Sequence, residues 1–186
     1  MHLARFRCRL AALAIGAFSS SAAADPEWST GIAAGAAATG DRRAWERTAF
    51  WGAVHADVIL GRTSRRAVGI GPSLELGTVA FSDVRLLGGP TVLIPLGELL
   101  AASITPAGYL RSSSMGALGG VSARTFFGVR AYGYDGYAVA GGIVLGFDQD
   151  VGASREHAIV LAAQVDGLLL ALPALLLFEW LRGSRD

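Results

Sequence analysis

The sequence predicts an all-β fold, an eight-stranded antiparallel up-and-down transmembrane β-barrel with a short apolar C-terminal tail. Three observations support this fold class: apolar and polar residues alternate, the alternating segments number eight, and short polar turns separate them. Each segment has about ten residues or more, and a tilted strand needs about 9–11 residues to cross a bilayer. Because unpaired backbone groups are costly in hydrocarbon, a sheet crosses a membrane only when it closes on itself.

The first 24 residues have the features of a secretory signal peptide. A basic segment, a short apolar segment and a run of small residues follow one another: Arg5, Arg7 and Arg9, then residues 10–18, then residues 22–24. Cleavage between Ala24 and Asp25 removes the only cysteine, Cys8, and three of the 16 basic residues, so 13 arginines remain against 15 acidic residues. The mature chain therefore forms no disulfide, and it has no basic stripe of the kind that binds nucleic acid.

Hydrophobic residues make up 52% of the chain, yet no charge-free apolar run reaches the roughly 18 residues of a spanning helix. A helical inner-membrane protein is therefore the weaker alternative. We expect the barrel over residues 25–170 and the apolar tail, a short helix or a strand extension, over residues 171–186.

The first four predicted strands cover residues 29–40, 48–62, 67–81 and 83–95. The first is rich in Ala and Gly, whose small side chains suit a narrow interior. In the second, TAFWGAVHADVILGR, apolar residues alternate with His55 and Asp57, so one face is apolar and the other ionisable. The third and fourth repeat this pattern, with Glu75 and Arg85 on the polar face.

The last four predicted strands cover residues 99–111, 121–132, 137–148 and 157–168. Tyr109, Arg124 and Gln164 lie on their polar faces, opposite aliphatic residues. The segment 137–148 sets its apolar residues against Ala and Gly. We expect turns at the Ser/Gly-rich SSSMGALGG and at DQDVGASRE.

Three prolines and the tail do not follow the alternating pattern. Pro72, Pro90 and Pro106 lie inside predicted strands, although a closed barrel has no free edge for residues that lack an N–H. Each therefore needs a bulge or a place near the rim. In the tail, Pro173 and Gly183 could bracket a short helix, and an extension of the last strand is the alternative.

The charged face of the alternation predicts an ion-paired barrel interior. Its expected members are Asp57, Glu75, Arg85, Arg124, Arg130 and Asp166, with the polar residues His55, Thr91, Tyr109 and Gln164 beside them. Buried charges are tolerable when they are paired and hydrogen-bonded, and a guanidinium group can bridge two carboxylates. This pattern favours a lumen filled by side chains over a continuous water channel.

His55 and Asp57 are weak catalytic candidates. At positions i and i+2 of one strand they share a face, so the carboxylate can orient the imidazole. Hydrolysis also needs a nucleophile, and Ser73, Thr91 or Ser122 cannot be placed from sequence. We expect no metal site and no cofactor, because His157 has no cysteine or clustered histidine beside it.

Aromatic residues near the predicted strand ends suggest interfacial girdles. The expected members are Trp28, Trp45, Trp51, Tyr132, Tyr134 and Tyr137, with Trp180 in the tail. The alternative is that aromatic residues simply favour strands.

In its signal peptide, alternating segments and inward charges, the chain resembles small bacterial outer-membrane β-barrels of the OmpA/OmpX-like class over residues 28 to 170. The resemblance implies residence in the bacterial outer membrane, contact with outer-membrane lipids, and handling by the export and barrel-assembly machinery. Two features depart from the class: all loops are short, and the chain ends on LRGSRD rather than on a terminal aromatic residue. The oligomeric state is left open.

Three functions are compatible with this pattern, because fold alone does not select function. The leading hypothesis is a barrel with a structural or minor-conduit role. A second is a barrel enzyme that acts on lipid A or phospholipid through His55 and Asp57. A third is a soluble lipocalin-like binding barrel, with its apolar face turned inward.

Overall fold

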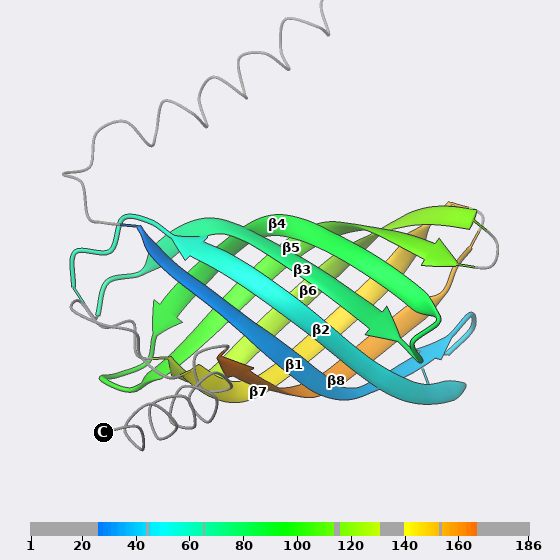
Figure 1. Cartoon of the computed structure of the whole chain (residues 1–186), viewed down its shortest axis with the longest axis horizontal. Helices are drawn as coiled ribbons and strands as arrows, with labels where there is room; N and C mark the ends of the chain where they lie inside the picture. Colours follow the sequence, from blue (N-terminus) through cyan, green and yellow to red (C-terminus); the bar gives the residue numbers. More distant parts are fainter. Residues whose placement is uncertain are drawn as a thin grey trace, which may run out of the picture.

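The structure is a computed structural model that describes residues 26–43, 45–64, 66–113, 116–130, 140–152 and 154–166 (Figure 1). The expected signal peptide, Tyr132, Tyr134, Tyr137 and the tail over 171–186 lie outside the described residues, as does the side chain of Arg130.

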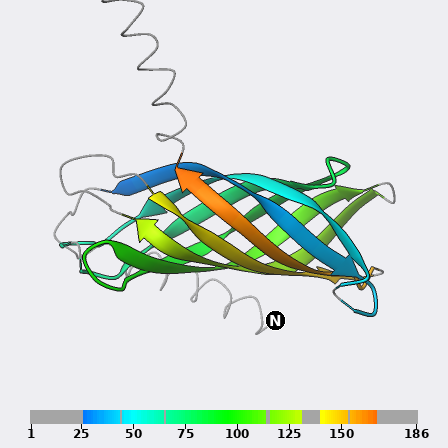
Figure 2. The same cartoon turned by 90° about the horizontal axis from the view of Figure 1, so that it is seen from below.

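Eight antiparallel strands form one closed barrel, in which each strand pairs with its neighbours in chain order. Their bounds are β1 Glu27–Gly40, β2 Arg47–Ile59, β3 Gly69–Val79, β4 Asp83–Pro95, β5 Leu100–Ser113, β6 Gly116–Arg130, β7 Ala140–Val151 and β8 His157–Asp166. Antiparallel pairing of β1 with β8 closes the sheet, and Figure 2 shows these two strands (blue and orange) side by side. The predicted all-β class, strand number and up-and-down order are confirmed.

The two rims of the barrel differ in the connections they carry. The termini rim is the end at which β1 begins at Glu27 and β8 ends at Asp166. The hairpin rim is the opposite end, where residues 41–46 join β1 to β2 and residues 80–82 join β3 to β4. Ala80 and Phe81 have positive φ in the second of these turns, as a tight hairpin requires.

Alternation along each strand separates an apolar outside from a mixed inside. Large apolar side chains are exposed on all eight strands, as at Leu74 and Leu145, each 55% exposed. Across the described strand residues, the outward-facing series contains no Asp, Glu or Arg. The charged side chains in the interior are buried, so the predicted division between the faces follows the pleat.

The interior also has an apolar part, in which small residues of β1 and β8 face larger side chains from other strands. This cluster contains Ala33, Ala37, Trp51, Ala53, Val79, Phe126, Val144, Val160 and Ala162. A second, smaller cluster contains Ile59, Leu93 and Ala101 and lies toward the termini rim. An eight-stranded barrel is just wide enough for such packing.

Two predicted turns lie where expected but are shorter, because the strands run further than their composition suggests. Residues of the Ser/Gly-rich segment extend β5 to Ser113 and begin β6 at Gly116. Likewise β7 continues through the DQD sequence to Val151. Aspartate is disfavoured in strands, but Asp148 and Asp150 are stabilised in β7 because each accepts hydrogen bonds from arginines inside the barrel.

The prolines occupy neither bulges nor rims. The same register holds on both sides of Pro72 between β2 and β3, and on both sides of Pro90 between β4 and β5. The prolines instead leave the neighbouring ladders interrupted, since they have no N–H to donate.

No helix long and apolar enough to cross a membrane occurs among the described residues.

The β1–β8 seam is packed too closely for a side chain at Gly35. A Cβ at this position would meet the Leu161 carbonyl oxygen and the Cα and Cβ of Ala162. Gly35→Val should therefore lower the free energy of unfolding by about 1–3 kcal/mol, the usual cost of overpacking. Ala34→Val, at the exposed neighbouring position, should change it by less than about 0.5 kcal/mol. Denaturant titration in detergent, followed by tryptophan fluorescence, measures both; equal losses would contradict a tightly packed seam.

Candidate functional site: the ion-paired lumen and its cavity

Asp148 is the centre of the buried ion pairs. Its side chain is 1% exposed and accepts hydrogen bonds from Arg124 Nη1 at 2.5 Å, Arg85 Nη1 at 2.9 Å and the Ser122 hydroxyl at 2.7 Å. The strands fix this meeting: Ser122 lies directly opposite Asp148 in the β6–β7 pair, and Arg124 follows on the same face of β6. One carboxylate from β7 thereby joins β4 to β6 across the lumen.

Arg124 links this centre to β3 and to the apolar cluster. Its Nη2 lies 3.2 Å from Glu75 Oε1, and its guanidinium carbon lies 5.6 Å from the centroid of the Trp51 ring. A guanidinium group stacks favourably on an aromatic face while its planar edge binds carboxylates. Trp51 and Glu75 therefore fix Arg124 between the charged and apolar parts of the interior.

A second group of charges extends the network toward the hairpin rim. Asp150 accepts hydrogen bonds from the Tyr109 hydroxyl and from Arg111 Nη2, both at 2.5 Å. Asp83 bridges Arg85 and Arg111, which lie directly opposite each other on β4 and β5. The shared carboxylate offsets the repulsion between these neighbouring cations.

We call these groups the arginine–carboxylate cluster: Glu75, Asp83, Arg85, Arg111, Arg124, Asp148, Asp150 and Glu156. Five carboxylates face three guanidinium groups, so the formal charge of the cluster is negative. Arg47, exposed at the hairpin rim, adds one more guanidinium group through its pair with Glu156.

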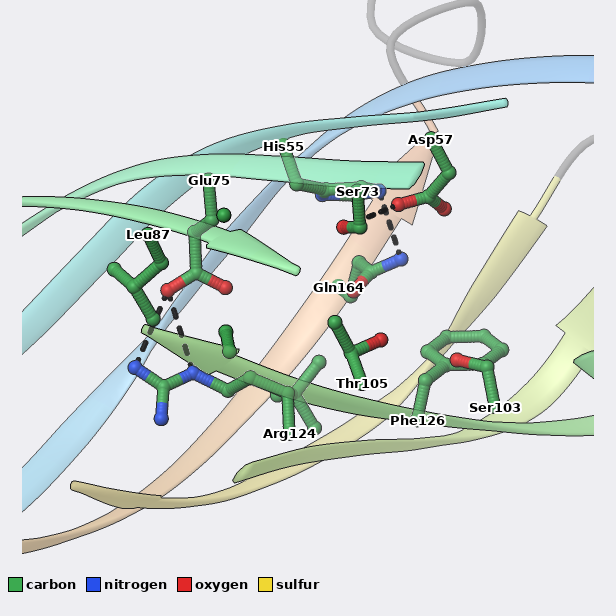
Figure 3. Close-up of a pocket in the computed structure, with 13 residues that line it drawn as sticks. His55, Asp57, Ser73, Glu75, Leu87, Ser103, Thr105, Arg124, Phe126 and Gln164 are labelled. Carbon is green, nitrogen blue, oxygen red and sulfur yellow. Dashed lines mark hydrogen bonds and ion pairs between the residues drawn. The ribbon is translucent and has the colours of Figure 1, made fainter. Parts of the chain in front are cut away.

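A cavity of about 40 Å³ lies beside the cluster, in the middle of the barrel (Figure 3). It is lined by His55, Asp57, Ser73, Glu75, Leu87, Gly88, Ser103, Thr105, Ala107, Arg124, Phe126, Val144 and Gln164. Such a volume accommodates about three water molecules, and the polar lining supplies hydrogen-bond partners for them. The cavity is therefore large enough and polar enough to hold water.

His55, Asp57 and Ser73 bring three reactive types of group to the cavity. The Ser73 hydroxyl donates a hydrogen bond to Asp57 Oδ1 at 2.9 Å, and Gln164 Nε2 lies 3.1 Å from His55 Nε2 (Figure 3). Ser73, one of the candidate nucleophiles that the sequence could not place, is thus hydrogen-bonded to the carboxylate of Asp57. In a hydrolytic triad the imidazole holds the serine proton and the carboxylate orients the imidazole; here the serine hydroxyl donates to the carboxylate instead.

Side chains from β1, β2 and the loop after β2 meet at the termini rim. Arg62 Nη1 lies 2.6 Å from Glu27 Oε2, and Arg62 Nε donates to the Ala67 carbonyl. The Arg62 side chain is buried there beside Ile59, whose neighbours in the interior are Leu93 and Ala101. On the β2, β4 and β5 side of the barrel, this layer lies between the cavity and the termini rim.

The structure brings most of the predicted interior residues together. Glu75, Arg85 and Arg124 belong to the arginine–carboxylate cluster, while Asp57 and Asp166 are buried on the side of the cavity nearer the termini rim. The predicted polar residues His55, Thr91, Tyr109 and Gln164 are all buried, and Thr105 donates a hydrogen bond to Thr91. The side chain of Arg130 lies outside the described residues.

One predicted girdle residue is in the wrong place. Trp51 is 1% exposed and stacks under Arg124, because its odd-numbered position puts it on the inward face of β2 with His55 and Asp57. Trp28 and Trp45 are exposed, at the termini rim and the hairpin rim respectively. Tyr132, Tyr134, Tyr137 and Trp180 lie outside the described residues.

Sequence reasoning missed five members of the cluster: Asp83, Arg111, Asp148, Asp150 and Glu156. Arg111 shares a face with Tyr109, so the alternation of β5 already indicated its place. Asp148 and Asp150 are two residues apart, as inward neighbours in a strand must be, but their acidic sequence is typical of a turn.

Among the residues that the structure describes, no group of three or more His, Cys, Asp or Glu side chains is arranged to hold a metal ion.

Loss of the central carboxylate should be far more damaging than loss of a surface ion pair. Asp148→Ala leaves Arg85 and Arg124 without a shared partner and should lower the free energy of unfolding by about 3–5 kcal/mol. The control is Arg66→Ala, which breaks the exposed Arg66–Glu98 pair and should cost less than about 1 kcal/mol. Urea titration in detergent compares the two, and similar small losses would show that the cluster does not stabilise the barrel.

Comparisons with known proteins do not assign a function to this site. No protein-family model matches the chain, and no curated protein resembles it in sequence. The chemistry of the lumen therefore has to be inferred from the residues that line it.

Proposed function

We propose that this chain is a bacterial outer-membrane barrel with a structural role, whose ion-paired interior holds the strands together and blocks free passage of solutes. One observation carries the proposal: large apolar side chains are exposed on every strand, while the buried face holds the charges. In water this distribution is unfavourable, because soluble monomers rarely expose apolar patches beyond a few hundred Å². In a bilayer the same surface contacts acyl chains.

The closed topology supports the same proposal. A sheet that spans hydrocarbon must pair all its edges, and the β1–β8 ladder over ten residue pairs removes the only edges this sheet would have. The expected signal peptide gives such a chain a route out of the cytoplasm. The exposed Trp28 and Trp45 at opposite rims suit the two interfaces of a bilayer.

The interior supports a blocked lumen. The arginine–carboxylate cluster crosses the barrel near the hairpin rim, and the Arg62–Glu27 pair with Ile59, Leu93 and Ala101 packs near the termini rim. Water in the cavity between them has side chains on both sides. A minor leak is compatible with this arrangement, whereas a wide aqueous pore is not.

The lipocalin-like alternative requires the opposite orientation of the faces. A soluble binding barrel keeps its apolar face inside and its charges in water, but here Leu74 and Leu145 are exposed while Arg85 and Asp148 are buried. We therefore favour the membrane barrel.

Membrane residence predicts heat-modifiable behaviour. The mature chain should need detergent for solubility, and the unheated protein should migrate faster in gel electrophoresis than the heated protein, because the closed barrel resists SDS. In lipid vesicles, Leu145→Arg should destabilise the barrel by about 2–4 kcal/mol, as cations on the lipid face near the midplane do. A monomeric, detergent-free protein with unchanged mobility would contradict membrane residence.

The blocked lumen predicts the absence of large conductance. Planar bilayers that contain the purified barrel should show no large, steady current, because charged side chains cross the lumen between the rims. Asp148→Ala combined with Arg85→Ala should raise the frequency of current steps if the variant folds. Large, steady currents from the unaltered protein would overturn the blocked interior without affecting membrane residence.

A further inference from the structure

Three prolines form a row across the outer wall of the barrel. Pro72 lies directly opposite Pro90 in the β3–β4 pair, and the β4–β5 register places Pro90 opposite Pro106. All three are exposed on the outward face. Their places in the middle of three adjacent strands are unusual, because a closed barrel normally uses every N–H in its ladders.

The row leaves two breaks in the hydrogen-bonded wall. Between β4 and β5 the ladder stops at Gly88 opposite Gly108 and resumes at Val92 opposite Ile104. Between β2 and β3 it stops at Asp57 opposite Ser73 and resumes as a single bridge from Leu60 to Ile70. A segment of the β3–β4 pair is thus bonded within itself but not to its neighbours.

The break between β4 and β5 leaves acceptors without donors. At the position where Pro90 faces Pro106, each residue offers a carbonyl oxygen and neither has an N–H. An unpaired carbonyl at membrane depth is costly. A guest that carries hydroxyl or amino donors would satisfy this position.

The polar cavity lies directly behind this break. Gly88, Thr105 and Ala107, which lie at the break, are part of its lining. Gly88 and Gly108 face each other on the outward side, so neither contributes a side chain to the wall there, and Leu74 of β3 is the outward side chain beside Gly88. Toward the two rims, in contrast, the cavity is covered by Arg124 with its carboxylates and by the Ile59 layer. The lateral wall beside the cavity is therefore the part in which the backbone ladder is interrupted.

We propose that the cavity binds the head of a single-chain amphiphile, which reaches it from the lipid through the wall between β4 and β5. This inference rests on the proposed membrane residence. The tail remains among the outward aliphatic side chains, while the head replaces the cavity water. The lining holds the carboxylates Asp57 and Glu75 and one cation, Arg124, which Glu75 and Asp148 already bind, so the site selects a hydroxyl- or amino-bearing head over a carboxylate.

The route is tested by cysteine labelling in phosphatidylcholine vesicles, since the mature chain lacks cysteine. Ala107→Cys places a thiol in the cavity at the break, and Ala162→Cys places one at a buried inward position on β8 away from it. N-dodecylmaleimide, a lipid-soluble single-chain reagent, should label the first about tenfold faster than the second, because only the weakened wall opens. A sulfonated, water-soluble maleimide should label both slowly.

Restoring the missing donors should close the route. Pro90→Ala with Pro106→Ala supplies two N–H groups that can complete the ladder. The rate at which N-dodecylmaleimide labels Ala107→Cys should then fall about tenfold, because each restored hydrogen bond slows the opening several-fold. Pro95→Ala is the matched control, because Pro95 ends β4 beyond the break and its paired neighbour is Ala101. Hydrogen exchange at Thr91 and Thr105 should slow in the double variant alone.

Protection experiments test the head-group chemistry. Monododecanoylglycerol, which offers hydroxyl donors, should protect Ala107→Cys from N-dodecylmaleimide, whereas dodecanoate at the same concentration should not. Equal protection by both would overturn the selection for donors.

The experiment distinguishes a barrel without a lateral route from a protein that does not reside in the membrane. Heat-modifiable mobility in the same vesicles reports membrane insertion. An inserted barrel in which both thiols react equally, or in which the water-soluble reagent reaches Ala107→Cys as fast as the dodecyl reagent, would overturn the lateral route alone. An uninserted protein would overturn the membrane residence on which the route depends.

Discussion

Pairing of β1 with β8 is the constraint on which the rest of the structure depends. Once the sheet is closed, alternate side chains must point either to a narrow interior or to the surroundings, and no third environment is available. The aliphatic side chains then cover the outside, and the charges share the limited interior space. The small residues of β1 and β8 follow from the same closure, since Gly35 leaves no room for a side chain at the seam.

A narrow interior explains why most of the buried charges join one connected cluster. Each isolated charge would lose its hydration, but Asp148 receives three donors and Arg111 contacts three carboxylates. Breaking such a pair is costly, although the pair itself adds little over an apolar replacement. We interpret the cluster as a device that fixes which strands meet across the lumen, in addition to filling it.

The fold could be predicted from the sequence because few architectures besides a closed barrel produce alternation with a period of two, repeated eight times. Alternation also places Glu75, Arg85 and Arg124 inside, but it does not show which of them meet, because contacts across a barrel depend on register. Asp148 escapes prediction because its acidic neighbourhood is typical of turns. For Trp51, the phase of the alternation is the better guide than nearness to a strand end. The prolines stand out in the sequence, yet only the paired strands reveal that Pro72, Pro90 and Pro106 form one row.

The orientation of the two faces can be measured most directly along β7 (Ala140–Val151). Single spin labels at positions 143 to 147 in lipid vesicles report whether each side chain contacts oxygen dissolved in the acyl chains. We expect high oxygen accessibility at Ile143, Leu145 and Phe147 and low accessibility at Val144 and Gly146. Uniform values, or high accessibility at Val144 and Gly146 with low accessibility at Leu145, would contradict an apolar outside in contact with lipid.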